Sequence, residues 1–311
     1  MSAPELIAVC GPTASGKTRL GIELARALDG EIVSADSMQV YRGMDVGTAK
    51  ASAAERAAVP HHMLDVADPR ENYSVARWTE AAGRCCDDIL SRGKLPIVVG
   101  GTGLYIDSLL SGRDFALERG SGALRERLEA EYERLGPEAL HERLRRIDPE
   151  RAGMLAPGDR RRVLRALEVY ELTGETITAH DARTRAQPPR YRAKRIVLSF
   201  ADREELYRRI DARVDAMVAA GLFEEVAGLL AQGLDASCTA MQAIGYKEAA
   251  LAVRGSISRE EAAARIKQAS RRYAKRQLTW FRRAPDALWI EWRGEPDFAR
   301  ALERVLDNWE N

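Results

Sequence analysis

The chain has 311 residues, of which 45% are hydrophobic and 31% charged, and its formal net charge is +1. This composition predicts a soluble globular protein with room for one large domain, or for a domain that carries an insertion. It excludes a membrane-spanning protein, because no apolar run approaches the roughly 20 residues that a helix needs to cross a bilayer.

The first element that the sequence predicts is a buried strand at residues 6–10, and apolar periodicity predicts a helix from about residue 17. Between them stands GPTASGKT, which has the spacing of a phosphate-binding loop. Glycines let backbone N–H groups approach an anion, and the helix start adds a positive dipole. We predict that the loop binds a polyphosphate through Gly11, Pro12, Thr13, Ala14, Ser15, Gly16, Lys17 and Thr18. Thr18 is also the expected Mg²⁺ ligand.

Two polar residues follow later strands of the same predicted sheet. Asp36 ends the short strand at 31–36, and Thr102 follows the strand at 95–99 within a glycine turn. Ligands of parallel α/β sheets lie beyond the carboxyl ends of the strands, so both residues should lie beside the phosphate loop. Asp36 could be a general base, or alternatively a magnesium ligand or helix N-cap.

Residues 114–194 lack strand-like runs, and we predict an all-helical insertion there, within a core formed by 1–113 and 195–311. Helical spacing covers 124–144 and 158–170, and strand character returns at 195–200. Further helices are expected at 203–230, with a possible break near Gly221, and at 258–281, before a last strand at 288–292. The predicted fold class is α/β, a parallel sheet like that of P-loop NTPases, flanked by helices.

Basic residues gather at 160–165, 185–195 and 271–283, although the whole chain is nearly neutral. Clustered Arg and Lys bind phosphates without reading sequence, and aromatic rings can stack unpaired bases. Tyr273, Trp280 and Phe281 lie within the third cluster, which favours RNA binding there. For the other two clusters, solvated helix faces explain the pattern equally well.

Taken together, these stretches resemble the family of bacterial tRNA dimethylallyltransferases, also called tRNA isopentenyltransferases. The resemblance runs nearly end to end and in the family's order. It rests on GPTASGKT (11–18), SADSMQVY (34–41), GGTGLY (100–105), RALEVYELTG (165–174), RIDARVDAMVAAGL (209–222), QAIGYK (242–247) and AKRQLTWFRR (274–283). One difference is Arg161-Arg162, where family members often have Gln-Arg.

The resemblance implies transfer of a dimethylallyl group from dimethylallyl diphosphate to N6 of the adenosine 3′-adjacent to the tRNA anticodon. Pyrophosphate leaves, and Mg²⁺ is the implied cofactor. Asp36 would accept the N6 proton, Thr102 would contact substrate, and Arg213 would join the loop in binding the diphosphate. The insertion would clamp the anticodon stem, and we expect a cytoplasmic monomer. The implied tRNA-binding residues are Ser37, Met38, Gln39, Arg125, Arg161, Arg162, Arg165, Gln242, Gly245, Tyr246, Lys247, Lys275, Arg276, Gln277, Thr279 and Trp280.

Two other functions fit part of the sequence. A small-molecule or nucleotide kinase would use the same loop for ATP and Asp36 as a base, but it leaves the basic, aromatic segment at 271–283 unexplained. A non-catalytic RNA-binding protein with a vestigial nucleotide fold would bind RNA and lose no activity when Asp36 is replaced.

Overall fold

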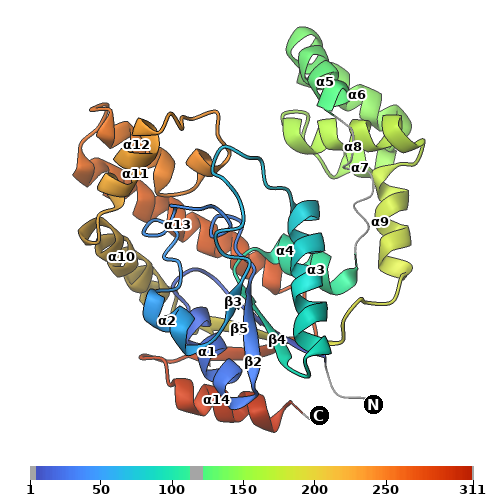
Figure 1. Cartoon of the computed structure of the whole chain (residues 1–311). Coiled ribbons are helices and arrows are strands. Elements are labelled where there is room, and N and C mark those ends of the chain that lie inside the picture. Colours follow the sequence, from blue (N-terminus) through green and yellow to red (C-terminus); the bar gives the residue numbers. More distant parts are fainter. Residues whose placement is uncertain (1–4, 113–121, 310–311) are drawn as a thin grey trace. The chain divides into compact units, whose positions relative to one another are not determined.

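The computed structural model describes residues 5–112 and 122–309. Its centre is one sheet of six strands in the order β3-β2-β4-β1-β5-β6, and each neighbouring pair is parallel (Figure 1). The strands are β1 (Leu6–Cys10), β2 (Gly30–Ser34), β3 (His61–His62), β4 (Leu95–Gly100), β5 (Ala193–Phe200) and β6 (Leu288–Trp292). The predicted α/β class, with a parallel sheet flanked by helices, is confirmed.

The helices of the sheet-containing part are α1 (Lys17–Ala27), α2 (Ala53–Ala58), α3 (Val75–Ser91), α4 (Gly103–Ser111), α10 (Arg203–Ala219), α11 (Leu222–Ala231), α12 (Tyr246–Val253), α13 (Arg259–Phe281) and α14 (Phe298–Asp307), with the 3-10 turn η2 (Ala240–Gln242). Among the described residues, no helix combines the length and the apolar character needed to span a bilayer.

Both faces of the sheet are buried, which explains why its strands are apolar throughout. Along β1, Leu6 and Ala8 belong to one core cluster, whereas Ile7 and Val9 belong to a second cluster. This alternation follows from the two-residue period of a strand. Burial on both faces is typical of parallel sheets covered by helices, and it selects the continuous hydrophobic runs seen in the sequence.

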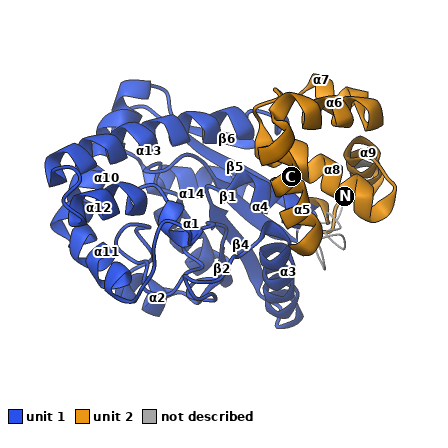
Figure 2. Cartoon of the chain, turned by 90° about the horizontal axis from the view of Figure 1, so that it is seen from above, with its two compact units in different colours: residues 1–110, 191–311 blue, residues 111–190 orange. Residues whose placement is uncertain are grey.

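The chain divides into two compact units, residues 1–110 with 191–311 and residues 111–190 (Figure 2). The second unit contains α5 (Gly122–Leu135), α6 (Pro137–Ile147), α7 (Pro149–Gly153), α8 (Arg160–Thr173) and α9 (Ile177–Ala186). It has a hydrophobic core of its own, which includes Leu128, Leu144 and Leu167.

Two of the predicted helical stretches are each divided by a glycine. The helical spacing predicted over 124–144 is divided between α5 and α6, which are separated at Gly136 with φ of 85°. Pro137 follows directly and cannot donate the backbone hydrogen bond that a continuous helix needs. The break expected near Gly221 is confirmed, since this glycine has φ of 98° between α10 and α11.

The register of the strands brings three chain segments to one edge of the sheet. Cys10 at the end of β1 lies opposite Gly100 at the end of β4, and Ser34 at the end of β2 lies opposite Val99. The phosphate loop, Asp36 and Thr102 follow these three ends. A Cβ on Gly100 would come within 2.1 Å of the Ala35 carbonyl oxygen, so glycine is required for this close approach.

Candidate active site

The phosphate loop at 11–18 turns sharply between β1 and α1. Gly11 has φ of 145° and Gly16 has φ of 90°, and a Cβ on Gly11 would lie 2.5 Å from the Leu198 carbonyl oxygen. Ala14 also adopts a positive φ of 63°, a region that costs a residue with a Cβ about 1–2 kcal/mol. The Ser15 hydroxyl is buried and has no hydrogen-bond partner among the described residues. The loop therefore has the strained, inward-facing geometry of an anion cradle.

Lys17 lies at the start of α1 and points back into this loop. Its Nζ donates a hydrogen bond of 2.6 Å to the Pro12 carbonyl oxygen. Burial, and then the nearby Arg213 guanidinium, lowers the pKa of Lys17 to about 7, against the opposing effect of the Asp36 carboxylate. An anion bound in the loop would restore the charged form of this lysine.

Arg213 reaches the same place from α10. Its Nη2 donates to the Thr48 carbonyl oxygen at 3.4 Å, and its buried Nε has no partner among the described residues. Burial lowers the pKa of this guanidinium, and the Asp36 charge raises it. A buried cation with an incomplete set of partners is unfavourable unless an anion joins it. Lys17 and Arg213 together therefore indicate an anion site.

Asp36 follows β2 and orders the turn after it. Its Oδ1 accepts backbone N–H groups from Met38 at 2.8 Å and Gln39 at 3.4 Å. Its Oδ2 makes no hydrogen bond or ion pair with any residue in 5–112 or 122–309. Thr102 Oγ1 accepts the backbone N–H of Ser37, the residue between Asp36 and Met38, at 3.2 Å. The capping role and the general-base role of Asp36 are thus compatible, because each uses a different oxygen.

These groups face one cavity of about 310 Å³. The predicted site residues that line it are Thr13, Lys17, Thr18, Asp36, Ser37, Met38, Gln39, Arg213, Gln242, Gly245, Arg276 and Gln277. Thr102 is not among the lining residues, and it acts on the wall through Ser37. No group of three or more His, Cys, Asp or Glu side chains in the described residues could hold a metal ion.

Sequence reasoning missed the apolar wall of this cavity, and it named Tyr273 only as a ring that could stack RNA bases. Ile210, Val214 and Met217 line it from α10 at helical spacing, on the same side as Arg213. Tyr273 of α13 also lines it, and burial, followed by the Asp36 charge, raises the pKa of its hydroxyl to about 12. Ile210 and Met217 stand three and four residues from Arg213, and this helical spacing could have predicted that they share its side of the helix.

Gln277, a predicted tRNA contact, instead joins two glycine-rich turns. Its Oε1 accepts the Thr13 backbone N–H at 2.9 Å, and its Nε2 donates to the Gly101 carbonyl oxygen at 2.9 Å. The residue is only 6% exposed. Gly101 needs to be glycine, since a Cβ there would lie 2.2 Å from the Gln277 amide nitrogen. The main visible role of Gln277 is to hold the phosphate loop.

Tyr246 is fully buried, so direct tRNA contact by this side chain is a wrong expectation for this structure. Trp280 is half-buried, and its indole N–H donates to Asp107 at 2.7 Å. Exposed positions among the other predicted tRNA contacts of this unit are Gln242, Lys247, Lys275, Arg276 and Thr279. These five residues stay predictions.

The arginines predicted to bind tRNA from the 111–190 unit are mostly engaged in ion pairs. Arg125 pairs with Glu129, and both Arg125 and Arg165 approach the buried Glu168. Arg162 pairs with Asp159 at the start of α8, next to the exposed Arg161. Because Arg125 and Arg165 form ion pairs within the unit, RNA binding is not needed to explain these two arginines.

Two family models match the chain, IPP transferase over residues 39–284 and isopentenyl transferase over residues 4–66. A tRNA dimethylallyltransferase of Pelobacter propionicus is 49% identical over 93% of this chain and 93% of its own length. One from Exiguobacterium sp. is 49% identical over 99% of this chain and 96% of its own length.

Solved structures agree with these matches. A tRNA isopentenylpyrophosphate transferase from Bacillus halodurans has a TM-score of 0.72 and 41% identity, and the match covers 98% of this chain and 95% of that one. A eukaryotic dimethylallyltransferase acting on tRNA has a TM-score of 0.83 and 28% identity, covering 98% and 80%. The resemblance inferred from the sequence motifs is confirmed, and the chain belongs to the IPP transferase family.

Proposed function

We propose that this chain transfers a dimethylallyl group from dimethylallyl diphosphate to N6 of the adenosine 3′-adjacent to the anticodon of tRNA. The observation that carries the proposal is one cavity lined by Asp36 and by two cations: Lys17, whose Nζ donates to a backbone carbonyl oxygen, and Arg213, whose Nε has no partner among the described residues. To alkylate an amine with an allylic diphosphate, a site must stabilise the anionic leaving group and supply a group that accepts the proton from the amine.

The diphosphate occupies the phosphate loop, beside the N-terminus of α1. Its charge grows when the bond between the allylic carbon and oxygen breaks. Lys17, Arg213 and the loop N–H groups stabilise that charge electrostatically. Arg213 lines the cavity and its Nε has no partner among the described residues, so it fits a ligand rich in acceptor oxygens. The five-carbon group then lies against the apolar wall of α10.

Asp36 acts as the general base for the exocyclic amine. N6 forms a bond to the allylic carbon as that carbon loses its oxygen, and the proton on N6 passes to Oδ2 of Asp36. This oxygen is the one that makes no hydrogen bond or ion pair with the described residues, whereas Oδ1 holds the turn. Thr102 fixes the turn through Ser37 and so keeps the carboxylate in place.

Mg²⁺ would be held by the Thr18 hydroxyl and by diphosphate oxygens. Thr18 is exposed and lines the cavity, which suits an ion that keeps several waters and takes few protein ligands. When bound, the ion adds positive charge beside the leaving oxygens.

The tRNA enters with the target adenosine flipped out of its stack, since the proposed base lines a concave cavity. Lys275, Arg276 and Thr279 are exposed on α13, and Arg276 also lines the cavity, so this face suits the RNA backbone. The 111–190 unit clamps the anticodon stem. We propose that the protein acts as a monomer, and we place the reaction in the cytoplasm, where tRNA is used.

Replacing Asp36 tests the base directly. Asp36→Ala is expected to lower the single-turnover rate of tRNA prenylation by about a hundred- to ten-thousandfold, because proton transfer is lost. Thr102→Ala should lower it by about tenfold, the effect of one positioning hydrogen bond. Both variants should keep their tRNA affinity. Asp235→Ala is the matched control, since Asp235 also orders a turn but is exposed. Unchanged rates in both variants would remove the proposed roles.

Lys17 predicts a pH effect on pyrophosphate binding. With a pKa of about 7 the free lysine is mostly neutral at about pH 8, and a bound anion raises that pKa. Binding at about pH 8 should therefore take up a proton, and this uptake should disappear below about pH 6, where Lys17 is already charged. Calorimetry in two buffers of different ionisation enthalpy measures it. Lys17→Arg, which is always charged, is the control, and equal uptake in both proteins contradicts the prediction.

The exposed basic face of α13 predicts salt-dependent tRNA binding. Lys275→Ala with Arg276→Ala should weaken binding and reduce the slope of log Kd against log salt by about 1–2. Arg265→Ala is the control on the same helix, because Arg265 pairs with Glu261 at 2.5 Å. A salt slope equal to that of the unchanged protein would argue against phosphate contact by Lys275 and Arg276.

A further inference from the structure

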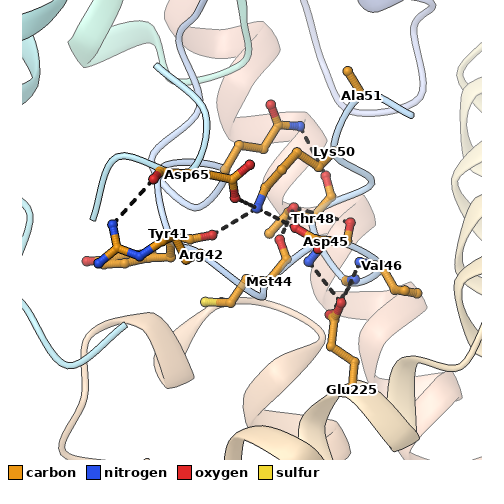
Figure 3. Close-up of polar contacts among 12 residues, drawn as sticks. Tyr41, Arg42, Met44, Asp45, Val46, Thr48, Lys50, Ala51, Asp65 and Glu225 are labelled. Atoms are coloured by element: carbon orange, nitrogen blue, oxygen red, sulfur yellow. Dashed lines mark hydrogen bonds and ion pairs between the residues drawn. The ribbon is translucent and has the colours of Figure 1, made fainter. Parts of the chain in front are cut away.

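One wall of the cavity is a loop that another helix holds by its backbone. The carboxylate of Glu225, on α11, accepts N–H groups from Asp45 at 2.8 Å, Val46 at 2.8 Å and Gly47 at 3.1 Å (Figure 3). Three consecutive amides thus converge on one side chain. Hydrogen bonds to an ionised acceptor are stronger than those between neutral groups, so these three bonds fix the loop firmly. We call Glu225 and the three amides of 45–47 the bracket.

The side chain of Tyr246 also holds Glu225 in place. Its hydroxyl donates to Glu225 Oε1 at 2.6 Å, and its ring is fully buried. Burial, and then the Glu225 charge, raises the pKa of Tyr246, so the phenol stays a donor. A Cβ on Gly47 would lie 2.5 Å from this ring, which shows how tightly the loop rests on it.

Thr48 and Ala49, the next two residues of the loop, connect the segment 45–47 to the cavity. The Thr48 carbonyl oxygen accepts from Arg213 Nη2 at 3.4 Å and from Gln39 Nε2 at 3.2 Å. The Ala49 carbonyl oxygen accepts a second, longer bond from the same amide at 3.4 Å. Thr48, Ala49, Arg213 and Gln39 all line the cavity.

The loop is also held by Lys50, whose side chain is 2% exposed. Its Nζ donates to the Tyr41 carbonyl oxygen at 2.8 Å and pairs with Asp45 at 2.5 Å and Asp65 at 2.7 Å (Figure 3). Lys50 and Glu225 thus hold the two ends of the segment 45–50, and the Thr48 carbonyl lies between them.

We infer that Glu225 is a positioning residue for Arg213: by gripping the amides of 45–47, it sets the carbonyl that orients the guanidinium toward the leaving group. The inference rests on the proposed function, in which Arg213 binds the diphosphate. A glutamine cannot replace this carboxylate, because both carboxylate oxygens accept hydrogen bonds. The NH₂ group of a glutamine would face the same N–H and O–H donors and could not accept from them.

Affinity for inorganic pyrophosphate measures the effect without tRNA or turnover. Glu225→Gln is expected to weaken pyrophosphate binding by about tenfold, the scale of a lost charge-assisted bond. Glu224→Gln is the matched control, since the neighbouring Glu224 is exposed and pairs with the exposed Arg259 at 2.9 Å. That variant should bind pyrophosphate as the unchanged protein does.

A double-mutant cycle separates positioning from general loosening of the fold. In an Arg213→Ala background, Glu225→Gln should have no further effect on pyrophosphate affinity, because the group it positions is gone. An effect of the same size in both backgrounds would overturn the inference. Tyr246→Phe, which leaves the carboxylate in place, should weaken binding by a smaller factor in the same direction.

The outcomes for the inference and for the proposed function are distinct. If Arg213→Ala weakens pyrophosphate binding and Glu225→Gln does not, the positioning role is wrong and the diphosphate site stands. If Arg213→Ala has no effect, the diphosphate site itself is wrong. Should Glu225→Gln fail to fold, unchanged affinity in Tyr246→Phe overturns the positioning role.

Discussion

The structure depends on two half-buried positive charges that are not fully paired among the described residues. Lys17 and Arg213 lie on different helices, α1 and α10, and both have pKa values lowered by burial. A fold that only needed stability would pair or expose them, because unpaired buried charge is unfavourable. The arrangement is explained when a multiply charged anion supplies the missing partner. A diphosphate leaving group meets that requirement, and its departure returns the site to the unpaired state.

The rest of the core places Asp36 close to these two cations. Parallel pairing of β2, β4 and β1 fixes the ends of the three strands at one edge, so Asp36 follows β2 close to the loop that follows β1. Glycines at 11, 100 and 101 allow the backbone and Gln277 to approach closely enough to hold this geometry. The site is therefore built mainly from main-chain register, and side chains from α10, α11 and α13 refine it.

Local pattern predicted what depends on local chemistry. The phosphate loop and the strand ends are readable from a few adjacent residues, and the structure confirms the strand–loop–helix context. The break at Gly136-Pro137 was also readable, but the charged helical spacing around it outweighed the breaker. Arg165 and Glu168 stand at helical spacing, so their ion pair was visible in principle as well.

Long-range contacts were not predictable in the same way. Gln277 bonds to a residue 264 positions away, and no spacing rule in the sequence points to that bridge. Likewise, the motif around Tyr246 suggested an RNA contact, whereas the fold uses the residue to support Glu225. Such roles follow from which helix covers which loop, and this is decided by packing over the whole sheet.

Nucleoside analysis of tRNA tests the central claim most directly. Unmodified tRNA is incubated with the protein and either dimethylallyl diphosphate or ATP, digested to nucleosides, and examined by mass spectrometry. The account predicts that one adenosine, 3′-adjacent to the anticodon, gains one five-carbon isoprene unit with the allylic donor only, with pyrophosphate released in equal amount. Phosphate transfer from ATP without any prenylated adenosine would contradict it.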